Sequence, residues 1–117
     1  MDQAAFIART KAYSLRIIRL VESLPKEDIA RTLGHQLLRA GCSVSANYRA
    51  ANRAKSRADF IAKLAIVEEE CDETLHWLEL LVDCGRIKSS KVALLKQEGD
   101  EILSMVVASI RTAKSRR

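Results

Sequence analysis

Two groups of side chains in this 117-residue chain have the types and spacing that could do chemistry. The first is Glu73 and His76, a Glu-x-x-His pattern that di-iron carboxylate proteins carry on a bundle helix. Such a centre needs a second copy of the pattern and two further glutamates. The other histidine, His35, follows Thr32 at that spacing, so half of the ligands are missing. We therefore expect a surface or boundary histidine at His76, and no metal or other cofactor.

The second group is basic and consists of Arg49, Arg53, Lys55, Arg57 and Lys63. Arg49 and Arg53 are four residues apart and share one face of a helix. Lys55 and Arg57 follow on a turn, and Lys63 lies less than two turns into the next helix. Cations placed in this way can hold phosphates without reading bases. These five residues are our candidate nucleic-acid-binding residues.

The surroundings of this cluster allow two interpretations. Asn47, Tyr48 and Asn52 lie among the cations and could add hydrogen bonds or a stacking ring. Residues 1–63 carry a net charge of +7, residues 64–101 carry −6 and residues 102–117 carry +4. The cations could therefore pair with the acidic half of the chain or remain solvated instead. No base-reading motif accompanies the charge.

Motifs typical of catalysis are missing from the sequence. There is no glycine-rich phosphate loop, nucleophile elbow or HExxH pattern. The carboxylates of residues 68–73 point around a helix, whereas general acid–base catalysis needs them to converge in a dry cleft. We expect a protein that is not an enzyme and that takes no small-molecule substrate.

The cysteines and the apolar runs indicate a cytoplasmic protein. Cys42, Cys71 and Cys84 are odd in number and lack CxxC spacing, so we expect small buried hydrophobes, with no disulfide or zinc site. The N-terminus has no signal-peptide pattern, and no apolar run is long enough to span a bilayer.

Apolar residues recur every three to four positions along almost the whole chain, which predicts an all-α fold. Pro25 suits the first turn of a helix, Ser56 suits an N-cap and Gly85 suits the left-handed residue after a helix. Short connections between long helices favour an up-down-up-down antiparallel four-helix bundle in one domain, residues 1–117. The predicted helices cover about residues 2–23, 26–52, 57–84 and 89–114.

Two features of these helices bear on packing. Gly34 and Gly41 lie inside the second helix, where each costs roughly 1 kcal/mol unless a neighbouring helix approaches closely, which is what we expect. The predicted inner face of that helix runs from Ile29 through Leu37 to Asn47 and Ala51. All four apolar faces are wider than a single bundle needs, which favours self-association.

Residues 33–85 resemble a family of four-helix-bundle proteins that are encoded by intervening sequences within bacterial 23S rRNA genes. The same family includes the accessory variability determinant of diversity-generating retroelements. The likeness rests on QLLRAGCSVSANYRAANRAKSRADFIAKL and ETLHWLELL, whereas the first and last helices agree only in length and pattern. The matching residues are Arg39, Gly41, Ser43, Ala46, Asn47, Tyr48, Arg49, Ser56, Asp59, Phe60, Glu73, Thr74, Trp77 and Leu78.

The resemblance implies a bundle that assembles into a ring-like homopentamer and that binds other molecules without catalysis. The retroelement relatives present a basic surface to a reverse transcriptase and its RNA template. Our leading hypothesis is an oligomeric bundle that binds RNA or an RNA–protein complex, such as a reverse transcriptase, through the basic cluster. The alternative is a protein-interaction scaffold with no nucleic-acid role. A metal-dependent enzyme built on Glu73 and His76 is the remote third hypothesis.

Overall fold

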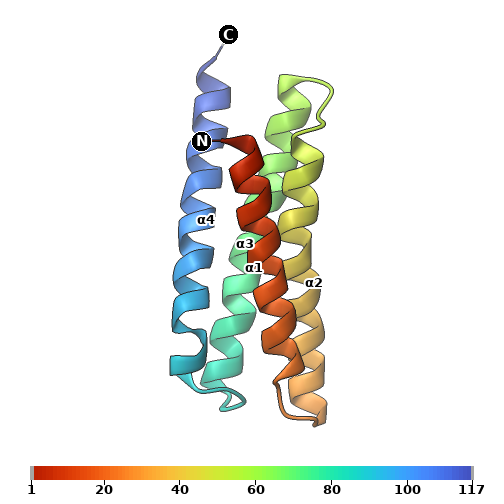
Figure 1. Ribbon diagram of the computed structural model, residues 1–117, viewed down its shortest axis with the longest axis vertical. Coiled ribbons are helices and arrows are strands. Elements are labelled where there is room, and N and C mark those ends of the chain that lie inside the picture. The colour runs from red at the N-terminus through yellow and green to blue at the C-terminus, as the bar shows by residue number, and fades with distance from the viewer. Residues whose placement is uncertain (1, 117) are drawn as a thin grey trace.

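The computed structural model describes residues 2–116, which form four helices and no strand. The helices run alternately up and down in a molecule measuring 50 × 21 × 20 Å (Figure 1). The predicted all-α, up-down-up-down bundle is therefore confirmed, and every helix end lies within two residues of its predicted place. The bounds are Gln3–Glu22 for α1, Asp28–Ala51 for α2, Arg57–Asp83 for α3 and Ser89–Ser115 for α4.

The ends of α3 form as the local sequence predicts. The Ser56 hydroxyl accepts a hydrogen bond from the Asp59 backbone N–H at 3.0 Å, which satisfies one of the free amides of the first turn. After Cys84, the chain leaves the helix through Gly85, whose φ of 79° lies in the left-handed region that favours glycine.

The start of α2 differs from the prediction. Pro25 and Lys26 lie in the connection, and the N-cap is Glu27, whose carboxylate accepts from the Ala30 N–H at 2.7 Å. The same carboxylate accepts a hydrogen bond from Arg86, in the α3–α4 connection, at 3.1 Å. Because Glu27 also pairs with Arg86 of another turn, it is favoured as the N-cap of α2 over Ser23 or Leu24.

In α1, α3 and α4 the buried residues recur mostly every three to four positions, as the periodicity of the sequence predicts. In α2 the inner face is offset at both ends from the prediction: Ile29 is 48% exposed, whereas Ala30 is buried, and Tyr48 is buried in place of Asn47. Residues three and four positions from a buried one can both lie on its face, and at both ends the later of the two is the buried one. The largest side chains enclosed in the core are Tyr13, Tyr48, Phe6, Ile17, Leu37, Leu64, Leu78, Leu81 and Ile102.

Close approach of α1 and α2 explains the glycine in the middle of α2, as predicted. A Cβ atom at Gly41 would stand 2.7 Å from a methyl carbon of Ile17. The Ser14 hydroxyl lies 2.7 Å from the Gly41 carbonyl, to which it donates, and 2.7 Å from the Ser45 hydroxyl. The polar contact is possible only because the backbones are so near each other.

One side of the bundle is packed less completely than the others. Successive helices pack tightly along their lengths, whereas α1 and α4, which are also neighbours in the bundle, make much less contact. α1 has 20 residues and α4 has 27, so α4 is longer by about 10 Å. Figure 1 shows α4, in blue, continuing past the start of α1 toward the level of the α2–α3 turn. We call this part of the molecule the open end.

Most of the wide apolar faces are used within the bundle. Side chains beside the stripes, such as Val21, Ile61 and Trp77, are half-buried against the core. Four large apolar side chains remain exposed, one on each helix: Leu15, Ile29, Ile66 and Leu94. Within residues 2–116, no helix is both long enough and apolar enough to cross a membrane.

Candidate nucleic-acid interface

The five predicted basic residues gather around the α2–α3 turn, and we call them the basic surface. Four of them line one shallow depression: Arg49 from α2, Arg53 and Lys55 from the turn, and Lys63 from α3. The small side chains of Ala46 and Ala50 also line it. Arg57 lies on the neighbouring side of the turn, where it faces the end of α4. The structure thus brings four of the five candidates together and places the fifth beside them.

Asp59 fixes the shape of this turn. One of its carboxylate oxygens accepts from the Lys55 backbone N–H at 3.1 Å, and the other lies 2.6 Å from the Lys63 ammonium. Hydrogen bonds from Lys63 and from the Lys55 backbone lower the pKa of the Asp59 carboxyl, so that it remains charged. Lys63 therefore carries a partly neutralised charge, and it positions the turn as well as adding to the basic surface.

Arg49, Arg53, Lys55 and Arg57 have no carboxylate partner among residues 2–116. The cations that bridge the helices come from elsewhere in the chain and are arginines: Arg9 contacts Glu98 and Glu101, Arg39 contacts Glu70 and Glu73, and Arg86 contacts Glu27. The alternative that the cluster pairs with the acidic half of its own chain is therefore wrong for these four. Their charge faces solvent.

Of the three side chains expected to assist the cations, Tyr48 does not reach the surface. Its ring is 2% exposed and stands edge-on to Phe6, with 4.7 Å between the ring centroids. Asn47 donates to the Ser43 carbonyl, and Asn52 donates to the Tyr48 carbonyl at 2.9 Å. The expected exposed stacking ring is thus not Tyr48. The spacing alone could not show this, because Asn47 and Tyr48 follow buried Val44 by three and four residues, and both spacings favour the same face of a helix.

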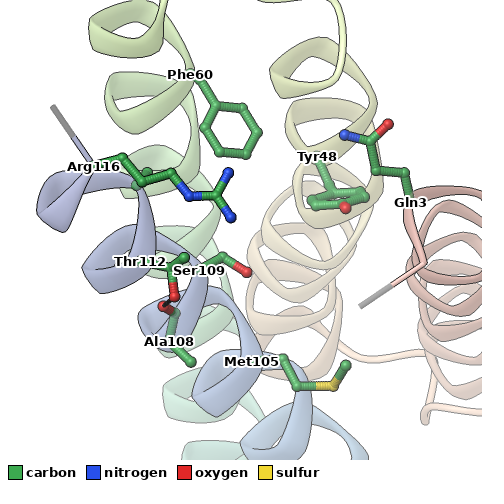
Figure 2. A pocket seen from close by; sticks show the side chains of 9 residues that line it. Gln3, Tyr48, Phe60, Met105, Ala108, Ser109, Thr112 and Arg116 are labelled. Atoms are coloured by element: carbon green, nitrogen blue, oxygen red, sulfur yellow. Dashed lines mark hydrogen bonds between the residues drawn. The ribbon is translucent and has the colours of Figure 1, made fainter.

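A groove at the open end was not predicted. It has a volume of about 380 Å³ and lies where α4 extends beyond α1, against α2 and α3 (Figure 2). Its sequence signal is the difference in length between the first and last helices. The lining residues include no acidic side chain; they are Gln3, Tyr48, Phe60, Met105, Ala108, Ser109, Thr112, Ala113 and Arg116.

The Glu-x-x-His pair has structural partners. The Glu73 carboxylate pairs with Arg39 and accepts from the Trp77 indole N–H at 3.1 Å. His76 is exposed and stands edge-on to the Trp77 ring, with 4.9 Å between the centroids. His76 is thus the surface histidine that we expected. No cluster of three or more potential metal ligands occurs within the described part of the chain.

The cysteines differ in their surroundings. Cys71 is buried in the core, as predicted, and burial raises the pKa of its thiol to about 12. Cys42 and Cys84 are only half-buried, and burial also raises the pKa of the Cys42 thiol. None of the three forms a disulfide.

Fold and surface together define an antiparallel helical bundle with a cluster of uncompensated cations around its α2–α3 turn. The chain belongs to the 23S rRNA-intervening sequence protein family, whose pattern it matches over residues 3–108. It is similar to a crystal structure of a protein of unknown function from the S23 ribosomal protein family of Bacteroides thetaiotaomicron VPI-5482. The two are 33% identical with a TM-score of 0.88, over 95% of this chain and 99% of that one. No curated protein matches the chain.

Proposed function

We propose that this protein binds RNA, alone or in a complex with protein, through the basic surface and without catalysis. The observation that carries the proposal is that Arg49, Arg53, Lys55 and Arg57 are clustered and lack carboxylate partners. Cations that are already held by carboxylates would have to break those pairs before they could neutralise phosphates. Solvated, closely spaced cations release counterions from a polyanion without that cost.

The family takes its name from intervening sequences of the 23S rRNA gene, and this association favours RNA over other polyanions. A reverse transcriptase bound to its RNA template is the protein-containing partner that the retroelement relatives suggest. Free RNA and the RNA template of a reverse transcriptase both present phosphates, so the same cations would bind either one. The competing proposal, a scaffold for proteins alone, makes the opposite prediction for the experiment that follows.

The test is a titration of structured RNA at several salt concentrations. We expect the logarithm of affinity to fall with the logarithm of salt at a slope of about −0.7 to −0.9 per phosphate neutralised. The triple variant Arg49→Glu, Arg53→Glu, Arg57→Glu should lower the affinity at every salt concentration and reduce the slope by about two. Absence of binding at low salt, or an unchanged affinity in the variant, would remove the proposal.

A matched control distinguishes RNA binding at the basic surface from binding that depends only on the net positive charge of the protein. Arg19, Lys26 and Lys91 are exposed and unpaired within residues 2–116. They belong to the end of α1, the α1–α2 connection and the start of α4, which lie at the end of the bundle away from the α2–α3 turn (Figure 1). Reversing these three residues to Glu changes the net charge by the same amount. Binding at the basic surface predicts a much smaller loss of affinity for this control, and equal losses would contradict it.

We also propose that copies of the chain associate, in the ring of five that the resemblance implies. Support comes from Leu94, a large apolar side chain on α4 that is 73% exposed, because contact with another copy would remove its apolar surface from water. Contacts between unlike faces of identical subunits form a ring when the rotation between neighbours closes, which for five subunits is one fifth of a turn. Sedimentation velocity should report a species of about five times the chain mass of 13.1 kDa. A clean monomer at micromolar concentration contradicts this proposal.

A further inference from the structure

The groove at the open end has a composition that suits one kind of ligand. Phe60 and Arg116 border both this groove and a second hollow beside it, which Arg57 and Asn52 also line. Neither hollow is lined by an acidic residue, and neither Arg57 nor Arg116 has a carboxylate partner among residues 2–116. The groove itself is thus bordered by one uncompensated cation, Arg116, and the adjoining hollow adds a second, Arg57.

Figure 2 shows the Phe60 ring and the Arg116 guanidinium projecting into the same space, with the Ser109 hydroxyl beside them. Unpaired bases stack on aromatic rings and on guanidinium planes. The side chains of Ser109 and Gln3 make no hydrogen bond within residues 2–116, so they remain available to the polar edge of a base. The volume, about 380 Å³, is near the lower end for ligand sites and suits a single nucleoside-sized group.

We propose that this groove accepts one unpaired base of a single-stranded RNA segment, while the adjoining phosphates lie on Arg57 and Arg116. The inference rests on the proposed function and deepens it, because it names the class of RNA. The basic surface continues from Arg57 around the α2–α3 turn to Arg53 and Arg49, which gives the strand a cationic path away from the groove. A base in a duplex is stacked between its neighbours and cannot enter a recess between helices.

An acidic or apolar peptide is a weaker candidate for the same space. A peptide helix needs an extended apolar groove, whereas this one holds only about 380 Å³ and has Arg116 in its lining. A run of phosphates matches a row of cations, and a flat base matches a recess walled by Phe60. The charge around the groove therefore favours the nucleotide.

The experiment compares a single-stranded 12-nucleotide RNA with a blunt duplex of the same length, by fluorescence anisotropy in one buffer. Two variants alter the groove. Phe60→Leu removes the ring and keeps an apolar side chain where Phe60 packs against the edge of the core, and Ser109→Trp fills the space. Ser104→Trp, the same substitution at an exposed site of α4 outside the lining, is the matched control. Melting by circular dichroism confirms that each variant is folded.

We expect both groove variants to lose about tenfold in affinity for the single strand, within the roughly 5- to 150-fold that stacking of one base carries. Duplex affinity and the Ser104→Trp control should be unchanged. A second readout is Met105, one of two methionines in the chain and part of the lining. In a ¹³C-methyl methionine spectrum, its signal should shift with the single strand and remain in place with the duplex.

Two failures are distinguishable. If single strand and duplex bind equally, the groove variants change nothing and the Met105 signal does not move, the groove proposal is overturned. Sensitivity of that binding to Arg49→Glu and Arg53→Glu would leave the proposed function intact. If neither RNA binds at low salt, the proposed function fails first, and the groove proposal fails with it.

Discussion

The buried hydroxyl of Tyr13 allows a sharp test of how the core is packed. Tyr13 is fully enclosed, and its hydroxyl has no hydrogen-bond partner among residues 2–116. Burial raises the pKa of this phenol well above its usual range, so that it stays protonated. Gly99 of α4 faces it: a Cβ atom there would stand 2.7 Å from the hydroxyl oxygen and 2.9 Å from a methyl carbon of Leu75.

The substitution Tyr13→Phe removes the oxygen and keeps the ring. Because a buried hydroxyl without a partner costs about 1–3 kcal/mol, we expect the variant to be more stable by about 1 kcal/mol or more. For a domain of this size the melting temperature should rise by roughly 4 °C. The measurement is urea unfolding followed by circular dichroism, with the slope m unchanged.

Gly99→Ala tests the same contact from the other side. The new methyl group should gain about 1 kcal/mol of helix propensity and lose about 1–3 kcal/mol to overpacking against the hydroxyl. In the Tyr13→Phe background the nearest ring carbon stands at 3.4 Å, an ordinary contact, and only the flexible end of Leu75 must move. The double-mutant cycle should therefore show a coupling of about 1–2 kcal/mol in favour of the pair.

Two results refute this reasoning. If Tyr13→Phe is destabilising by about 1 kcal/mol, the hydroxyl has a partner, such as an enclosed water. If Gly99→Ala costs the same free energy in both backgrounds, the hydroxyl is not what keeps the position small.

Three further outcomes are expected. Gly41→Ala should destabilise the protein by about 1–3 kcal/mol in urea unfolding, because its Cβ atom would collide with Ile17, where α1 and α2 pack; an unchanged midpoint would contradict this. The pKa of the Cys71 thiol is raised to about 12, so its contribution to stability is complete below its unfolded pKa near 9 and is lost as pH rises toward 12. The melting temperature should therefore fall between pH 8 and 11, and it should fall less steeply in Cys71→Ala. Hydrogen bonds from Arg86 and the Ala30 amide lower the pKa of Glu27, so its contribution is present above its unfolded value near 4.5 and is lost as pH falls through its lower folded value; Glu27→Gln should show a weaker loss of stability in acid.

Helix ends that depend on local signals could be predicted from the sequence. Ser56 caps α3 through an amide three residues away, and Gly85 ends it through its own backbone, so neither needs a distant partner. The start of α2 could not be placed in the same way. Glu27 is held by Arg86, which is 59 residues further along the chain, and no window around Pro25 contains that information.

In the candidate site too, the features set by nearby residues could be predicted, and those set by distant residues could not. Arg49, Arg53 and Lys55 are near one another in sequence, so their shared depression follows from the turn alone. Whether these cations are neutralised depends on which cation pairs with the carboxylates of α3. Arg39 pairs with Glu70 and Glu73, and the sequence alone does not show this. The groove needs Phe60 from α3 and Arg116 from the end of α4 to meet beyond the start of α1, which only the assembled bundle determines.

The shortness of α1 has a consequence for local motion. The last turns of α4, beyond Met105, lack a full set of helical neighbours, so they can separate from the rest without the whole bundle unfolding. Amide hydrogens there should exchange with solvent faster than those near Ile102, at a rate set by local opening. A strand seated in the groove would slow that exchange, and the slowing would extend no further than the segment it clamps.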